Sequence, residues 1–198
     1  MAQIYPFRGV RPSPETAARV SALPYDVMSR EEAAQMAANR PDCILHVTRS
    51  EIDLPSTIDP HDDAVYRIAA ATYRRFRREG ILQEDTEPHF YFYRLTVGDR
   101  SQTGLVTAAA VDDYDNGVIL KHEKTRQVKE DDRTRHILET GAQTGPVFLA
   151  FRDHPRICQL TGQATARPPH VDFTTADRVR HQLWIAETEL TEPLRDVF

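Results

Sequence analysis

Apolar residues recur at helical spacing most clearly between Asp62 and Glu79, where they line one face of the segment. The residues of this face are Val65, Ile68, Ala69, Thr72 and Phe76. Gly80 follows directly and suits the left-handed position after a helix C-terminus. The pattern therefore predicts a helix over these residues.

Three further segments carry helix start or stop signals. Ser29 and Glu32 form a capping box at the start of "SREEAAQMAANR", and Pro41 ends this helix. A helix is also expected from Ser13 to about Val20, because proline and an acidic residue follow the serine. A Pro-bounded helix is expected near "HPRICQLTG".

Compact β-rich runs lie between these helices. Strands are predicted at "CILHVTR", "HFYFYRLTV", "TGLVTAAAV", "VILKHE", "PVFLAF", "VDFTT" and "VRHQLWIAE". The second and third flank "GDRSQ" and predict an antiparallel hairpin, whereas "DDYDNG" indicates a turn. The order of elements predicts an α+β (mixed α/β) fold class.

Composition bounds the possible partners. With 198 residues, 40% of them hydrophobic, the chain can bury one sizeable core, and we expect a single domain over residues 1–198. The net charge of −5 and the pI of about 5.9 make nucleic acid an unlikely main partner. Cys43 and Cys158 lie beside apolar residues and are expected to be small buried hydrophobes.

The two ends of the chain indicate its cellular location and its relation to a longer protein. The N-terminal "MAQIYPFRGVRP" lacks the apolar core of a signal peptide, and no run has membrane-spanning length, so a cytoplasmic location without membrane association is expected. The final "ELTEPLRDVF" predicts a helix with Thr191 as N-cap that stops after two turns. This abrupt stop favours the front part of a longer protein.

The segment "KHEKTRQVKEDDRTRH", residues 121–136, consists mostly of ionisable residues, and Val128 is its one clearly apolar side chain. A helix is expected from about Val128 to Gly141, with Asp132 and His136 on one face. Apolar residues are missing from that face until Ile137, so something polar must lie against it. Solvent and a charged ligand remain equal alternatives.

The residue types of this segment suit phosphate chemistry. Oxyanions could be held by Lys121, Lys124, Arg126 and Arg133, with Thr125 as a donor. A base or a Mg²⁺ ligand could come from Glu123, Asp131 or Asp132. Zinc is less natural, because His122 and His136 lie far apart and no thiolate is near.

Two other polar segments and one run of arginines are more often structural features than functional sites. "PYD" at residues 24–26 and "TRSEIDLP" at residues 48–55 are typical of turns. The arginines of "YRRFRREG" suit a solvated helix end. P-loop, G-x-G-x-x-G, H-E-x-x-H and G-x-S-x-G signatures are absent.

Several segments together resemble one family: "IYPFRGVRP", "LPYDVMSREEA", "ILHVTRSEIDLP", "VYRIAAATYRRFRREGIL", "HFYFYRL", "VDDYDNGVILKHEKT", "EDDRTRHI" and "TGPVFLAF". The chain resembles the "domain of unknown function 1015" proteins, which look like relatives of ADP-dependent free serine kinases. The resemblance implies a ParB/sulfiredoxin-like mixed sheet with flanking helices, binding ADP or ATP with Mg²⁺. Members also carry an "ADGHHR"-like phosphate-binding segment, which these residues lack.

The resemblance implies roles for the residues of "KHEKTR" and "DDRTRH". Phosphate or nucleotide binding would fall to Lys121, His122, Thr125, Arg126, Arg133 and His136, and Mg²⁺ to Asp131 and Asp132. Glu123 is the first choice for the catalytic base and Glu51 the second. The leading hypothesis is a small-molecule phosphotransferase acting on a hydroxyl substrate such as serine. A non-catalytic nucleotide-binding regulator of the ParB-like type and an inert N-terminal fragment are the alternatives.

Overall fold

The computed structural model describes residues 2–122 and 124–198. They divide into two compact units, each built from several stretches of the chain. Among the described residues, the sheet unit comprises 2–18, 84–122 and 149–198, and the helical unit comprises 19–83 and 124–148. Helices and small antiparallel sheets occur together, which confirms the mixed α+β class.

The sheet unit is built around one antiparallel sheet. Its elements, in chain order, are β1 (Ile4–Tyr5), β2 (Val10–Arg11), β4 (Tyr91–Val97), β5 (Arg100–Val106), β6 (Ala108–Ala109), α5 (Val111–Asp115), α7 (Pro155–Thr165), β7 (Val171–Thr174), β8 (Arg180–Ile185), η2 (Thr188–Leu190) and α8 (Thr191–Arg195). Four of the strands form a sheet in the order β5-β4-β8-β7, and β1 pairs separately with β6.

The hairpin of β4 and β5 confirms the prediction from sequence, with a tighter turn. Val97 pairs with Arg100, so only Gly98 and Asp99 connect the strands. Gly98 has φ +56°, a left-handed backbone angle that glycine adopts at no steric cost. The alternation of β4 then directs Phe92 to one face of the sheet and Tyr93 to the other.

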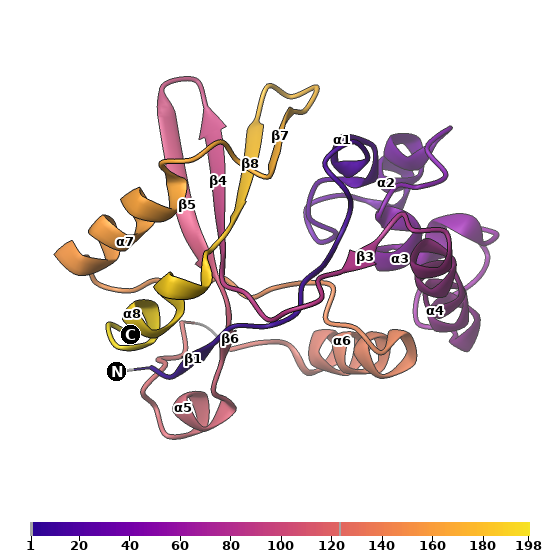
Figure 1. Ribbon diagram of the computed structural model, residues 1–198. Coiled ribbons are helices and arrows are strands. Elements are labelled where there is room, and N and C mark those ends of the chain that lie inside the picture. Colours follow the sequence, from indigo (N-terminus) through magenta and orange to yellow (C-terminus); the bar gives the residue numbers. More distant parts are fainter. Residues whose placement is uncertain (1, 123) are drawn as a thin grey trace. The chain divides into compact units, whose positions relative to one another are not determined.

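Helix α7 packs against one face of this sheet (Figure 1). Leu160 of α7 meets Phe92 of β4 and Trp184 of β8 in the core of the unit. Burial of an aromatic side chain of this size stabilises a fold by about 1.5–3 kcal/mol. These contacts fix the end of α7 relative to β8, where a pocket lies.

The helical unit contains the longest helices. Its elements, in chain order, are α2 (Arg30–Ala37), α3 (Leu45–Thr48), η1 (Ser50–Asp53), α4 (Asp63–Arg78) and α6 (Gln127–Thr140). Short elements at the passage between the two units are α1 (Ala17–Val20) and β3 (Gln83–Glu84). Helix α6 packs along α4 (Figure 1), and α3 and η1 also contact α4.

The predicted helix signals in this unit are confirmed. Ser29 and Glu32 form both hydrogen bonds of a capping box at α2. Asp62 caps α4 through the Ala64 amide, and Gly80 follows with φ +71°. These signals act within a few residues, so they do not depend on the rest of the fold.

The predicted strand "CILHVTR" is wrong, because residues 45–48 form the one-turn helix α3. Two small cores explain the change. Cys43 and Leu45 are buried against α2, whereas Val47 is buried in a second cluster with Phe76 of α4. A helical turn serves both clusters, and this packing overrides the β-propensity of the segment.

Strands are also missing at "VILKHE" and "PVFLAF" within the described residues, so these two predictions are wrong. In both segments large apolar side chains are exposed, with Leu120 and Phe148 each at 81%. A strand requires a neighbour for its backbone hydrogen bonds, and none pairs with either segment among the described residues. Composition alone does not supply that neighbour.

Three smaller expectations change. The segment "DDYDNG" contributes to the short helix α5 instead of a simple turn. Helix α8 begins at Thr191, but its N-cap is Leu190. Cys43 is buried as expected, whereas Cys158 is exposed, because it lies on the outer side of α7 beside Asp153.

No helix in the described part of the chain is both long enough and apolar enough to span a membrane.

Candidate functional site

Helix α6 carries many of the predicted site residues and lies within the helical unit. Arg126 is its N-cap residue in an extended conformation, and Gly141 closes it with φ +69°. The face predicted to meet something polar packs against protein: His136 and Thr140 are buried, and Asp132 and Arg133 are half-buried. The polar surroundings of this face are supplied by side chains of the same unit.

Asp132 accepts hydrogen bonds from three side chains. The Tyr66 hydroxyl of α4 lies 2.7 Å from Oδ1, and Nδ1 of His61 lies 3.3 Å from the same oxygen. The other oxygen, Oδ2, accepts from Nε of Arg133 at 2.8 Å and from its Nη2 at 2.5 Å. Burial acts to raise the pKa of Asp132, but the hydrogen bonds from Tyr66 and Arg133 outweigh it and lower the pKa. The carboxyl group is therefore ionised at neutral pH.

Arg133 is held between Asp132 and an aromatic ring. Its guanidinium carbon lies 4.5 Å from the ring centroid of Tyr25, a cation–π distance. The side chain keeps 28% of its surface exposed. Nη1 of Arg133 forms no hydrogen bond with another described residue, whereas Nε and Nη2 are both used. One edge of a fixed guanidinium is thus available.

Glu51 lies in η1 and is also nearly enclosed, with 10% of its side chain exposed. Arg49 donates from Nε to Oε1 of Glu51 at 2.5 Å. Nη1 of Arg49 donates to the Tyr25 carbonyl at 2.6 Å and to the Met28 carbonyl at 2.8 Å. Arg49 therefore ties Glu51 to the backbone of the segment that carries the Tyr25 ring.

His136 completes the group. Its Nε2 lies 2.8 Å from the Val47 carbonyl oxygen. Burial lowers the pKa of His136, with a smaller lowering by Arg133 and opposite effects of Asp132 and Glu51. The α6 cluster, as we call this set, consists of Tyr25, Arg49, Glu51, Asp132, Arg133 and His136.

The structure does not gather all the predicted residues at this cluster. Thr125 and Arg126 are exposed at the start of α6, where the Thr125 hydroxyl donates to the Glu130 carboxylate. Asp131 is exposed and accepts from Nε2 of Gln127 at 2.8 Å. Arg135, one position before His136, pairs with Asp63 of α4.

Lys121 and His122 belong to the sheet unit and are exposed. The Lys121 ammonium lies 4.5 Å from the ring centroid of Tyr114. Glu123, the first choice for the base, lies outside the described residues. Of the two choices for the catalytic base, Glu123 and Glu51, the structure therefore describes the surroundings of Glu51.

The α6 cluster has few free oxygen donors for Mg²⁺. Oxygen ligands from several carboxylates or carbonyls are typical of Mg²⁺ sites. Within residues 2–122 and 124–198, no group of three or more His, Cys, Asp or Glu side chains could hold a metal ion. Both oxygens of Asp132 already accept hydrogen bonds, so Asp131 is the freer of the two predicted ligands.

The sequence profile of one protein family matches residues 4–198. The family is described as Protein of unknown function (DUF1015). The chain belongs to this family. Comparisons with curated proteins and with solved structures gave no significant match.

Two members of the cluster were missed as site residues in this DUF1015 chain. Tyr25 and Arg49 lie in the segments "PYD" and "TRSEIDLP", which had been interpreted as turns. Their polar character at the edges of helices was the available signal. Sequence does not show that Arg49 spans from Glu51 to the Tyr25 carbonyl, because that contact depends on tertiary structure.

Proposed function

We propose that this protein takes part in nucleotide-dependent phosphoryl transfer to a small hydroxyl substrate, such as free serine. The observation that carries the proposal is the free edge of Arg133. Its guanidinium is oriented by Asp132 and by the Tyr25 ring, and Nη1 is left for a ligand. A planar guanidinium in a fixed orientation is the group that best recognises phosphate oxygens.

A second cation lies on the same side of α6. Arg126 and Arg133 are seven residues apart, which is close to two helical turns and about 10 Å along the axis. Arg126 stands at the N-terminus, where the helix dipole favours negative charge. Neither Arg126 nor Lys124 forms an ion pair with another described residue, so both are available for a phosphate chain.

The remaining residues have roles that follow from their surroundings. A bound ADP or ATP would supply the phosphoryl group. Glu51 would accept the proton of the substrate hydroxyl, with Glu123 as the other candidate base. Asp131 would be the more available carboxylate for Mg²⁺, because Asp132 orients Arg133. Catalysis would then rest on positioning and charge neutralisation.

The ion pair of Glu51 with Arg49 favours a second candidate, a nucleotide-binding regulator of the ParB-like type without turnover. Oε1 of Glu51 already accepts a hydrogen bond at 2.5 Å from Arg49, so this oxygen is occupied before any substrate hydroxyl arrives. In this alternative the α6 cluster and Arg126 bind the nucleotide, and Glu51 only holds Arg49. The two candidates differ in whether product forms.

The test combines binding with product analysis. The protein is incubated with serine, Mg²⁺ and either ADP or ATP, phosphoserine is followed by phosphorus NMR, and nucleotide affinity is measured by calorimetry. We expect Arg133→Gln and Arg126→Gln to weaken nucleotide binding about tenfold or more. Glu51→Gln should abolish product while the nucleotide still binds.

Arg74→Gln is the matched control, because Arg74 is an exposed arginine on a helix of the same unit. It should leave affinity and product unchanged. Nucleotide binding without phosphoserine would decide for the regulator. Unchanged nucleotide affinity in both arginine variants, together with no phosphoserine, would refute both candidates.

A further inference from the structure

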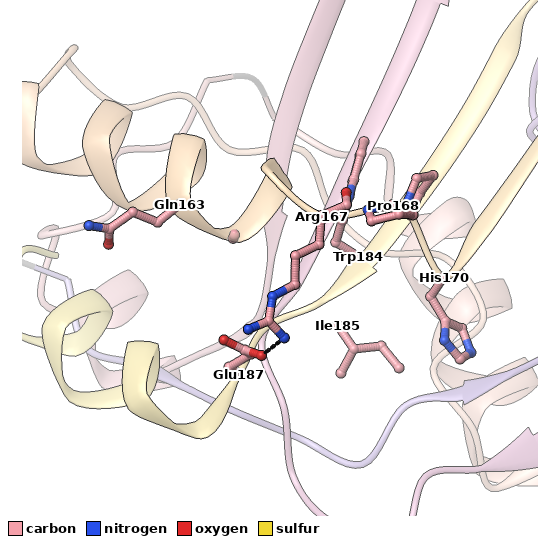
Figure 2. A pocket seen from close by; sticks show the side chains of 9 residues that line it. Gln163, Arg167, Pro168, His170, Trp184, Ile185 and Glu187 are labelled. Carbon is pink, nitrogen blue, oxygen red and sulfur yellow. Dashed lines mark hydrogen bonds and ion pairs between the residues drawn. The ribbon is translucent and has the colours of Figure 1, made fainter.

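The sheet unit holds a pocket that the proposed phosphoryl transfer does not use. It has a volume of about 410 Å³ and lies between the end of α7, the segment after it and the end of β8 (Figure 2). Its walls come from Gln163, Ala164, Arg167, Pro168, Pro169, His170, Trp184, Ile185 and Glu187. All of these residues belong to one unit, so the pocket is complete within it.

The apolar part of the pocket is rigid. Trp184 is 4% exposed, and its indole N–H donates to the Arg167 carbonyl at 2.8 Å. The guanidinium of Arg94 lies 4.9 Å from the Trp184 ring centroid and also reaches Thr165 of α7 at 3.3 Å. Two consecutive prolines in the wall restrict the backbone further. A ligand therefore meets a wall that is held in place, and because Trp184 is almost fully covered, the accessible apolar groups are mainly Ile185 and the two prolines.

The polar part contains Gln163, His170 and one ion pair between Arg167 and Glu187. The guanidinium of Arg167 and the carboxylate of Glu187 point toward each other across the pocket (Figure 2). Their side chains are 70% and 46% exposed, so the pair is well hydrated. Exposed pairs of this kind contribute little to stability, and a ligand can separate them at small cost.

We propose that this pocket binds a free α-amino acid with an apolar side chain. The carboxylate of the ligand would pair with Arg167 and its ammonium group with Glu187, so that each protein charge exchanges one partner for another. An anion alone would meet the negative Glu187, and a cation alone would meet the positive Arg167. The apolar side chain would lie on Ile185 and the two prolines, beside the small exposed edge of Trp184, and the volume leaves room for a ligand of this size.

The experiment uses the fluorescence of Trp184, which is the single tryptophan of the chain and lies in the pocket wall. The protein is titrated with L-leucine, and affinity is measured in parallel by calorimetry. We expect a saturable fluorescence change and a matching binding isotherm. N-acetyl-L-leucine lacks the ammonium group and L-leucinamide lacks the carboxylate. The affinity of each should therefore be at least about tenfold lower than that of L-leucine. L-serine should also bind at least about tenfold weaker, because it lacks the apolar side chain.

Variants separate the pocket from the rest of the surface. Arg167→Gln and Glu187→Gln should each weaken leucine binding about tenfold or more. Arg195→Gln is the matched control, because Arg195 forms a comparably exposed ion pair with Glu192 in the same unit. Arg133→Gln, which changes the proposed nucleotide site, should also leave leucine binding intact. The amino-acid pocket and the phosphotransfer proposal can therefore fail independently of each other. The proposal is overturned if leucine does not bind to the parent protein. It is also overturned if leucinamide binds to the parent protein as tightly as leucine does, or if Arg167→Gln binds leucine as tightly as the parent protein does.

Discussion

Nε2 of His136 in α6 lies 2.8 Å from the carbonyl oxygen of Val47 in α3. A carbonyl can only accept, so Nε2 carries a proton and donates it. Burial lowers the pKa of His136, which keeps the ring neutral at physiological pH. His136 was predicted from sequence to bind phosphate, but a neutral buried ring of this kind serves first as a tie between α6 and α3.

Replacement of His136 by alanine should destabilise the fold by about 1–3 kcal/mol, because the Val47 carbonyl would lose its partner in a buried position. Urea denaturation of the purified protein measures the change. Lys129→Ala is the control on an exposed position of the same helix, and it should change stability by less than about 0.5 kcal/mol. Equal stability of His136→Ala and the parent protein would contradict the role of this hydrogen bond.

Two histidines of the helical unit should titrate on opposite sides of the ordinary value of about 6.5. Nδ1 of His46 lies 2.9 Å from both carboxylate oxygens of Asp53, and this hydrogen bond raises the pKa of His46. Burial lowers the pKa of His136. Histidine ring signals followed by NMR across pH should give two separate midpoints in this order, and the reverse order would contradict it.

The two shifts have opposite consequences for stability. His46 contributes stability that is full below pH of about 6.5 and is lost as pH rises through its folded pKa. His136 has a lowered pKa, so stability falls as pH decreases from about 6.5 toward its folded pKa. His46→Gln should therefore remove the part of the stability profile that declines on the alkaline side. Persistence of that decline in His46→Gln would assign it to another group.

Elements with local signals could be predicted from sequence, whereas contacts between distant segments could not. The capping box of Ser29 and the hairpin turn at Gly98 involve neighbours in the chain, so residue type is sufficient. The helix at Leu45 depends on two separate cores. The same division holds in the site, where Asp132 was found from its spacing to His136. Its bond to Tyr66, sixty-six positions away, required the fold.

Asp132→Asn and Asp131→Asn form a matched pair on α6. The first removes the anionic acceptor of Tyr66 and Arg133 and should destabilise the protein by about 1–3 kcal/mol. The second changes an exposed side chain and should stay within about 0.5 kcal/mol. Thermal and urea unfolding measure both changes in stability. Similar effects of the two substitutions would show that the hydrogen bonds to Asp132 do not stabilise the fold.

The same pair reports on acid stability. The folded pKa of Asp132 is lowered, so its contribution is present above about pH 3.9 and is lost as pH falls through the folded pKa. Asp132→Asn should therefore lose less stability on acidification than the parent protein does. Asp131→Asn should follow the parent curve. A parent-like acid response of Asp132→Asn would place the titrating carboxylates elsewhere.

Gly9 in the sheet unit is packed directly under the Tyr91 side chain. A Cβ atom at Gly9 would lie 2.7 Å from the Tyr91 hydroxyl oxygen and 2.8 Å from Cζ, and the Gly9 amide donates to that hydroxyl at 2.8 Å. The ring cannot retreat freely, because its hydroxyl also donates to Asp85 at 2.7 Å. Gly9→Ala should therefore destabilise the protein by about 1–3 kcal/mol through overpacking.

Gly162 provides the control for this substitution. A Cβ atom there meets nothing within 4 Å, and the residue lies inside α7, so Gly162→Ala should stabilise the protein by about 0.5–1 kcal/mol. Tyr91→Phe removes the oxygen nearest to the new methyl group. The double variant Gly9→Ala, Tyr91→Phe should thus cost less than the sum of the two single changes, because the clash and the lost hydrogen bond share one atom. Strict additivity in urea denaturation would show that the Tyr91 hydroxyl does not limit the space at Gly9.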